Sequence, residues 1–295
     1  MKTNDTEIKA LINLLDDPDE GVYQHIRSRL IELGNPVIPS LENVWEFNSL
    51  GALFQDRIED IVHHIQFEDV KHQLTKWVQL PLPSLLDGLL IINQYQYPEL
   101  DTQIIKDEIK RLSREIWIEL NDELTALEKV RIFNQVIFQN HGYRGNKQNY
   151  HSPNNSYLST IIETKKGNPI LLSALYLLVA EELDEPIYGV NLPHHFITAY
   201  IDKHQLAKLL NENNSDVLFY INCFSQGSIL HQKELLDFLE QLNIAPQAKF
   251  FEPCSNLAIV KRVLRNLKHS YQQAGLIEKV DEIDTLLILL SQANG

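Results

Sequence analysis

Apolar residues recur at helical spacing along the first 119 positions of the chain. Within the first predicted helix these residues are Ile8, Leu11, Ile12 and Leu15. A spacing of three and four residues places them on one face of a helix. Gly34 is typical of the position just after a helix end. The same reasoning predicts helices at 7–15, 18–33, 41–45, 56–65, 70–78, 84–93 and 101–119.

One segment of this region, residues 14–41, reads LLDDPDEGVYQHIRSRLIELGNPVIPSL and resembles one unit of a HEAT-type helical repeat. A solenoid needs several stacked repeats to bury a continuous core, and this sequence contains one convincing unit. We therefore expect a helical, HEAT-like domain over residues 1–119. Its tryptophans, Trp45, Trp77 and Trp117, are expected in the core.

The pattern changes character after position 140. A predicted helix, 124–140, leads into a polar loop, 141–156, and then into a short helix from Ser156 to Glu163. Asn168 can cap the next helix, and Pro169 fits its first position because proline lacks the N–H that would be unpaired there. Short apolar or aromatic segments bounded by turn residues predict strands at 187–190, 196–201 and 217–222, with a polar insertion, 203–215, between the last two.

The end of the chain returns to helical spacing. Ser255 or Asn256 can cap a helix that runs to position 273, Gly275 turns the chain, and a second helix spans 277–290. This pair resembles a single tetratricopeptide-like hairpin, which cannot bury its own apolar face and should pack on the preceding domain. The predicted fold is α+β and mostly helical. Its expected parts are an N-terminal helical domain (1–119), a core with a small antiparallel sheet (120–252) and a C-terminal helical hairpin (253–295).

The balance of charges limits the classes of molecule that the chain can bind. The chain carries 40 acidic and 26 basic residues, a formal net charge of −14. Such a surface repels phosphate backbones and anionic lipids, so we expect neither nucleic-acid nor membrane binding. Two short basic clusters, Lys165-Lys166 and Lys261-Arg262, are explained at least as well by solvated helix ends.

The number of cysteines and the length of the apolar runs indicate the cellular compartment of the protein. The two cysteines, Cys223 and Cys254, are too few for a disulfide framework and lack zinc-site spacing. We therefore expect no metal and no cofactor. The longest nearly continuous apolar run, 169–180, is too short to span a membrane, and the first residues contain no apolar signal core. These features favour a cytoplasmic protein.

Several short strings occur in one order between positions 85 and 275. They are Gly142-Tyr143-Arg144-Gly145-Asn146, Tyr150, Asn155-Ser156-Tyr157-Leu158, Lys166-Gly167-Asn168-Pro169-Ile170, Gly189-Val190-Asn191-Leu192-Pro193, His195-Phe196 and Arg265-Asn266-Leu267-Lys268-His269-Ser270-Tyr271. Together they resemble the transglutaminase-like superfamily and, more narrowly, its bacterial SirB-type branch, named for a proposed regulator of invasion genes. Any one string is weak evidence, whereas the ordered set is strong.

The resemblance implies a papain-like arrangement of three side chains. A cysteine at a helix start is stabilised as thiolate by the helix dipole, a histidine activates it, and an Asp or Asn orients the histidine. Carried onto this chain, His195 matches the histidine and Asn222 the orienting residue. Pro169 stands at the cysteine position and has no nucleophilic atom. The SirB-type branch commonly shares this loss.

The candidate cleft combines the loop with these degenerate catalytic positions. Its members are Asn146, Tyr150, Asn155, Ser156, Gly167, Asn168, Ile170, His195 and Asn222. Structural roles compete with binding at most of them, because Asn and Ser satisfy backbone groups in turns and solitary histidines are commonly core residues. The functional interpretation adds that exposed N–H groups at Ile170 and Leu171 can bind a carboxylate or another anion. His194 should face away from the cleft if its strand is regular.

The leading hypothesis is a non-catalytic regulatory or scaffold protein that binds a protein or peptide partner. The alternative is a hydrolase or transamidase in which His195 activates water or Cys223. Adjacent strand residues face opposite sides, so Cys223 turns away if Asn222 turns toward His195. A third hypothesis is a structural protein without a pocket, in which Asn146, His195 and Asn222 lie far apart.

Overall fold

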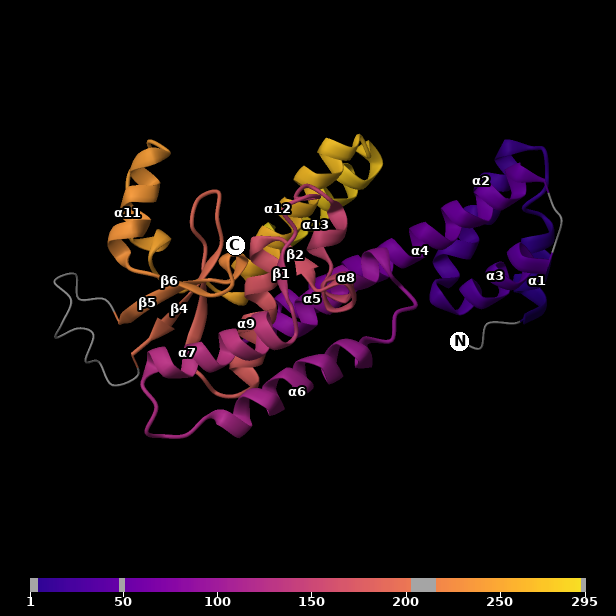
Figure 1. Cartoon of the computed structure of the whole chain (residues 1–295). Helices are drawn as coiled ribbons and strands as arrows, with labels where there is room; N and C mark the ends of the chain where they lie inside the picture. Colours follow the sequence, from indigo (N-terminus) through magenta and orange to yellow (C-terminus); the bar gives the residue numbers. More distant parts are fainter. Residues whose placement is uncertain (1–4, 48–50, 203–215, 293–295) are drawn as a thin grey trace. The chain divides into compact units, whose positions relative to one another are not determined.

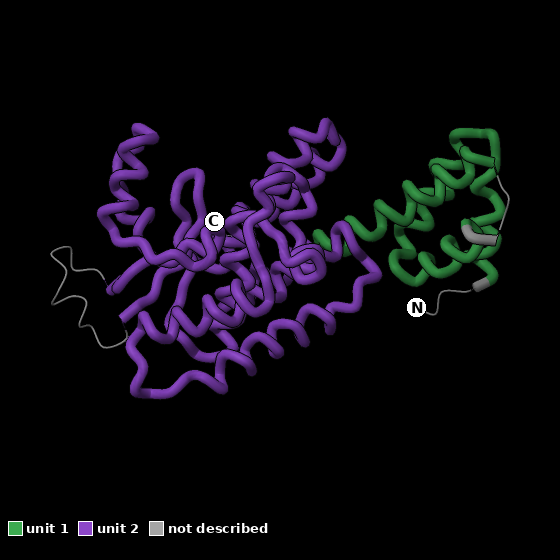
Figure 2. The backbone as a smooth tube through the Cα atoms, in the orientation of Figure 1, with its two compact units in different colours: residues 1–73 green, residues 74–295 purple. Residues whose placement is uncertain are grey.

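The computed structural model describes residues 5–47, 51–202 and 216–292, and these form two compact units (Figure 2). The first unit comprises Met1–Gln73 and the second Leu74–Gly295. The predicted insertion 203–215 lies outside the described residues. The fold is α+β and mostly helical, as predicted.

The first unit is a helical bundle (Figure 1). Its helices are α1 (Asp5–Asn13), α2 (Glu20–Leu33), α3 (Ile38–Phe47) and the first part of α4 (Ala52–Val78). The apolar face predicted for the first helix is buried in this unit's own core, together with Leu30 and Leu41. Asp19 caps α2, and Gly34 follows its end with φ of +69°. The helices predicted at 56–65 and 70–78 are a single helix, α4, because nothing between them breaks the backbone.

The second unit surrounds the buried helix α9 with helices and a small sheet (Figure 1). Its helices are α5 (Leu85–Gln96), α6 (Thr102–Glu119), α7 (Ala126–Asn134), α8 (Leu158–Thr164), α9 (Pro169–Glu182), α11 (Gln232–Gln241), α12 (Asn256–Ala274) and α13 (Ile277–Gln292). Its antiparallel sheet has the order β3 (Ile187–Val190), β4 (Ile197–Ile201), β5 (Val217–Asn222) and β6 (Ser228–Leu230).

The two faces of this sheet pack against different parts of the second unit. Ile197 and Ala199 of β4 join a core that includes Leu235 and Leu239 of α11. Thr198, which lies between them in the chain, is buried toward the side where Cys223 lies. This alternation is the expected period of two in a strand. The three predicted strands are confirmed within one residue, whereas α11 and β6 were not predicted.

The boundary between the two compact units lies between Gln73 and Leu74, inside the predicted N-terminal domain. Helices α5 and α6 were assigned to the N-terminal domain 1–119, yet both belong to the second unit. The reason is that α5 is buried on nearly all sides and packs on α8, α9 and α12. The division into 1–119, 120–252 and 253–295 stays a prediction. Of the three tryptophans, only Trp77 is buried, and the expectation for Trp45 and Trp117 was wrong.

Candidate functional site

A short parallel bridge forms the base of the candidate site. Strand β1 (Arg144–Gly145) pairs with β2 (Lys166–Gly167), so that Arg144 stands beside Lys166 and Gly145 beside Gly167. The Asn146 N–H extends the bridge by donating to the carbonyl of Gly167 at 2.9 Å. The polar loop between the strands therefore begins and ends at neighbouring points.

Amide side chains give this loop a defined shape. Asn146 Nδ2 donates to Asn155 Oδ1 at 2.9 Å, while Asn155 Nδ2 donates to the carbonyls of Asn149 and Tyr150 at 2.6 and 3.1 Å. Asn155 is buried, so these bonds are shielded from water. The Asn155 side chain thus satisfies carbonyl groups of the loop's own backbone. Tyr150 remains exposed, with its ring edge-on to Phe224 at a centroid distance of 5.9 Å.

The start of α9 is closed by its own cap. Asn168 Oδ1 accepts a hydrogen bond from the Leu171 N–H at 2.9 Å, and its Nδ2 donates to Ser156 Oγ at 3.0 Å. Pro169 and Ile170 are both buried. The predicted capping is therefore confirmed. The expectation of exposed N–H groups here was wrong, because Leu171 has an acceptor and the turn is covered by packed side chains.

His195 lies in the segment that leads into β4, half-buried between three elements. Its ring is 6.2 Å from the Phe238 ring of α11, and it interacts with the Asn222 side chain and with Arg262 of α12. Burial lowers the pKa of His195; the Asn222 contact raises it, and Arg262 lowers it further. The ring is therefore neutral near pH 7. His194 is exposed in a turn with φ of +57°, so no strand face orients it.

Arg262 holds in place the backbone segment that leads to His195. Its guanidinium donates to Asn191 Oδ1 at 2.8 Å and to the Leu192 carbonyl at 3.3 Å. Burial lowers the pKa of Arg262, which still leaves it charged. The interpretation of this arginine as a solvated helix end was wrong.

Neither cysteine lies against His195. Cys223 is wholly buried, with its sulfur 4.0 Å from Thr198 Oγ1 and in contact with Ser173 of α9. Burial raises the pKa of Cys223 to about 12 and that of Cys254 to about 11. Both thiols are therefore protonated at neutral pH. Asn222 and Cys223 diverge as the strand geometry predicted.

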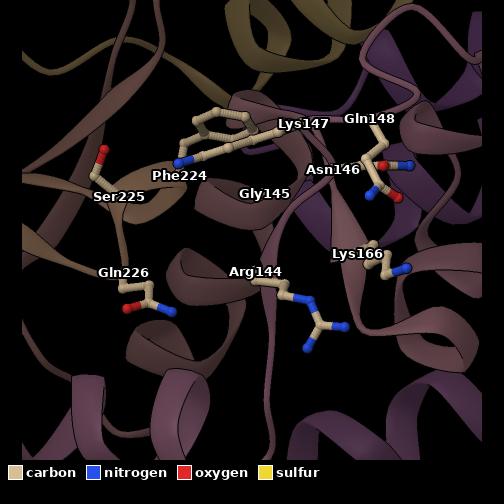
Figure 3. Close-up of a pocket in the computed structure, with 9 residues that line it drawn as sticks. All are labelled: Arg144, Gly145, Asn146, Lys147, Gln148, Lys166, Phe224, Ser225 and Gln226. Carbon is tan, nitrogen blue, oxygen red and sulfur yellow. The ribbon is translucent and has the colours of Figure 1, made fainter.

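An open pocket of about 700 Å³ lies over the parallel bridge (Figure 3). Its lining residues are Arg144, Gly145, Asn146, Lys147, Gln148, Lys166, Phe224, Ser225 and Gln226. In Figure 3, Ser225 and Gln226 lie across the pocket from Lys166 and Gln148. We call this cavity the basic pocket, because its lining contains three cationic residues and no acidic one.

The wall opposite the loop is a tight turn that follows β5. The Asn222 side chain accepts from the Ser225 N–H at 3.3 Å, and Gly227 closes the turn with φ of +75°. Asn134 of α7 donates to the Gly227 carbonyl at 2.9 Å and leaves no room for a side chain there. On the other side, a Cβ at Gly145 would lie 2.5 Å from the Phe224 ring. The bridge and the turn therefore pack directly against each other.

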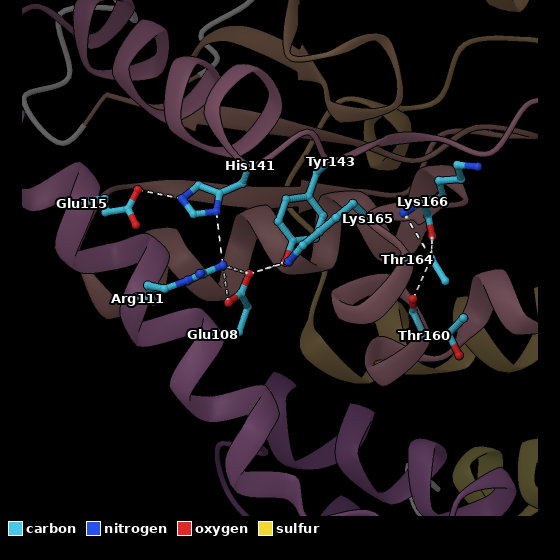
Figure 4. Close-up of polar contacts among 9 residues, drawn as sticks. All are labelled: Glu108, Arg111, Glu115, His141, Tyr143, Thr160, Thr164, Lys165 and Lys166. Atoms are coloured by element: carbon cyan, nitrogen blue, oxygen red, sulfur yellow. Dashed lines mark hydrogen bonds and ion pairs between the residues drawn. The ribbon is translucent and has the colours of Figure 1, made fainter.

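A polar network joins α6 to the residues that precede the two strands of the bridge (Figure 4). Glu108 of α6 accepts from Lys165 Nζ at 2.7 Å, from the Tyr143 hydroxyl at 2.8 Å and from Arg111. Burial alone would raise the pKa of Glu108, but these three donors outweigh it and lower the pKa. His141 extends the network by contacting Glu115 at 2.6 Å. Lys165 is therefore paired with Glu108, while its neighbour Lys166 lines the basic pocket.

The structure brings some predicted residues together and assigns others to the framework. His195 and Asn222 interact, and Asn146 lines the pocket whose opposite wall continues from Asn222. The buried framework residues are Asn155, Ser156, Gly167, Asn168 and Ile170. A ligand-binding role for any of these positions stays a prediction.

Sequence reasoning missed most of the pocket. The residues that it did not select are Arg144, Gly145, Lys147, Gln148, Lys166, Phe224, Ser225 and Gln226. Arg144 and Lys166 stood inside the strings that carried the family resemblance, which was the one available signal. In the described part of the chain, no group of three or more His, Cys, Asp or Glu side chains could hold a metal ion. No helix in that part is long and apolar enough to cross a membrane.

Comparison with known proteins agrees with this architecture. Residues 103–265 match the sequence model of a family described as the transglutaminase-like superfamily. A UPF0162 protein of Xylella fastidiosa (strain 9a5c) is 28% identical over 193 residues, which are 63% of this chain and 64% of that protein. The match thus spans slightly less than two thirds of the relative's length.

Two further relatives match larger shares of this chain. Protein SirB1 of Salmonella typhimurium is 23% identical over 69% of this chain and 72% of its own length. F-box only protein 21 of Mus musculus is 26% identical over 80% of this chain, which is 34% of that longer protein. No solved structure matches the chain.

Proposed function

This chain belongs to the transglutaminase-like superfamily, and we propose that it acts there as a non-catalytic module that binds a protein or peptide partner. The observation that carries the proposal is the buried Pro169 at the first position of α9, where catalytic members of the superfamily are expected to hold cysteine. Proline supplies neither a nucleophile nor an exchangeable proton. A regulatory or scaffold role in the cytoplasm is the corresponding biological hypothesis.

The state of the remaining chemical groups supports this proposal. Thiol catalysis needs a thiolate within hydrogen-bonding reach of a base. Cys223 instead lies against Thr198 and Ser173, and burial raises its pKa to about 12. His195 interacts with Asn222. Among the described residues, neither cysteine is placed to exchange a proton with its ring. The His195 region is therefore better suited to contact a ligand than to transform one.

The test combines turnover with thiol labelling. We expect the purified protein to show no turnover of peptide, amide, ester or amine-acceptor substrates. Iodoacetamide should label Cys254 slowly and Cys223 more slowly still, because Cys223 is fully buried. The His195→Ala variant should leave both labelling rates unchanged, measured by mass spectrometry of the digested protein.

His194→Ala is the matched control, because His194 is the exposed neighbour. Turnover that disappears in His195→Ala but persists in His194→Ala would overturn the proposal. Rapid labelling of Cys223 that depends on His195 would overturn it equally and would favour the hydrolase or transamidase alternative.

A further inference from the structure

The backbone holds two like charges side by side at the floor of the basic pocket. Arg144 and Lys166 are register partners in the parallel bridge between β1 and β2. Like charges on paired strand positions repel each other and destabilise the pairing. Across the residues for which positions are described, neither side chain has an ion pair or hydrogen bond, and the same holds for Lys147. The fold therefore leaves these cations without a counter-ion among the described residues, and an anion could pair with them.

Other cations of this unit show what a structural pairing looks like. Lys165 contacts Glu108 at 2.7 Å, and Lys129 contacts Glu185 at 2.7 Å. Both carboxylates are nearly buried, with 10% and 8% of their side chains exposed. In a chain of net charge −14, acidic residues are abundant. Their absence from the lining of the basic pocket makes it a local positive site on an acidic protein.

The neutral part of the lining suits a peptide. Gln148 and Gln226 present side-chain amides, and Ser225 presents a hydroxyl, whereas the Asn146 amide is already bonded within its own loop. Amide groups both donate and accept hydrogen bonds, so they match the alternating N–H and C=O groups of an extended backbone. Phe224 adds an apolar surface, since its ring is only partly buried.

The cations are distributed rather than convergent. Arg144 comes from β1, Lys147 from the following loop and Lys166 from β2. In Figure 3 the ends of the Arg144, Lys147 and Lys166 side chains lie at separate points of the pocket. A single compact anion would pair with one or two of them, whereas several spaced carboxylates can pair with all three. The cavity of about 700 Å³ has room for several residues of such a segment.

We infer that the basic pocket binds an acidic peptide segment, with its carboxylates on Arg144, Lys147 and Lys166 and its backbone on the amide side chains. This inference takes the partner class from the proposed function and names the chemistry of that partner. It also places the contact at the bridge and the Phe224–Gln226 turn rather than at the start of α9.

The experiment uses a fluorescein-labelled peptide of alternating glutamate and glycine and measures fluorescence anisotropy with the full chain. A glutamine–glycine peptide tests the need for charge, and unlabelled oligothymidylate and inorganic phosphate serve as competitors. The pocket variant is Arg144→Gln/Lys166→Gln. Its charge-matched control is Lys110→Gln/Lys233→Gln, which alters exposed lysines on α6 and α11 outside the pocket lining.

We expect the glutamate peptide to bind, more weakly as salt rises, and the pocket variant to lose about tenfold in affinity through two exposed charge contacts. The control should stay within about twofold of the parent protein. The pocket variant should unfold at no lower temperature than the parent, because neither side chain has an ion pair or hydrogen bond to lose among the described residues.

Equal affinity of the pocket variant and its control would overturn the inference, as would absence of peptide binding. Stronger binding of oligothymidylate would assign the pocket to nucleic acid, and full competition by phosphate would assign it to small anions; either result overturns the peptide proposal. These outcomes are independent of turnover, so the non-catalytic proposal can stand when the pocket inference fails.

Discussion

The start of α9 and the basic pocket both adjoin the β2 strand, yet they use their polar groups in opposite ways. At the helix start, Asn168 binds both Leu171 and Ser156, and every residue around Pro169 is covered. In the pocket, Arg144 and Lys166 face an open cavity without a counter-ion among the residues whose positions are described. The position where the family resemblance leads one to expect a cysteine is thus buried here, and the cations of the pocket lie beside it.

We expect the largest change in stability from a substitution at the closed start of α9. Asn168→Ala removes the cap of α9 and leaves the Ser156 hydroxyl without its donor, so it should lower the free energy of unfolding by about 2–3 kcal/mol. Asn154→Ala, an exposed position in the same loop, should cost no more than about 0.5 kcal/mol. Chemical denaturation of both variants measures the difference. Similar values for the two would show that the helix start is not held by its cap.

An intermediate effect should separate the two neighbouring lysines. Lys165→Gln breaks the contact with the nearly buried Glu108 and should cost about 1–2 kcal/mol at neutral pH. Lys166→Gln removes a side chain without a partner and should change stability by less than about 0.5 kcal/mol.

The pH dependence of that difference follows from Glu108. Its pKa is lower in the folded protein than its ordinary value of 4.5, so the unfolded state binds the proton more readily. The stabilisation is complete above about pH 4.5 and is lost as pH falls through the folded pKa. The cost of Lys165→Gln should therefore shrink in acid, as followed by denaturation at several pH values. A cost that is independent of pH would contradict the ion-pair interpretation.

The sequence predicted local structure better than the pocket. The cap at Asn168, the proline at the first position of α9 and the three long strands all follow from nearest-neighbour chemistry, and the structure confirms them. Helix α11 was missed, although its apolar residues Leu235 and Leu239 are spaced four apart and pack on the sheet.

The pocket was not predictable for a different reason. It unites the loop after Arg144, the bridge residue Lys166 and a turn that begins near Phe224, and nothing local in the sequence places these segments together. Lys165 and Lys166 look equivalent in sequence, and the tertiary structure alone separates them by giving Glu108 to the first. The exposed Trp117 shows the same limit, because helical spacing does not reveal which face a neighbouring element will cover.

Backbone amide chemical shifts during titration with the glutamate–glycine peptide can locate the bound segment residue by residue. We expect shifts at residues 144–148, at Lys166 and in the Phe224–Gln226 turn, with Ile170 and Leu171 unchanged. Shifts concentrated at Ile170 and Leu171, with the pocket residues unaffected, would contradict this expectation.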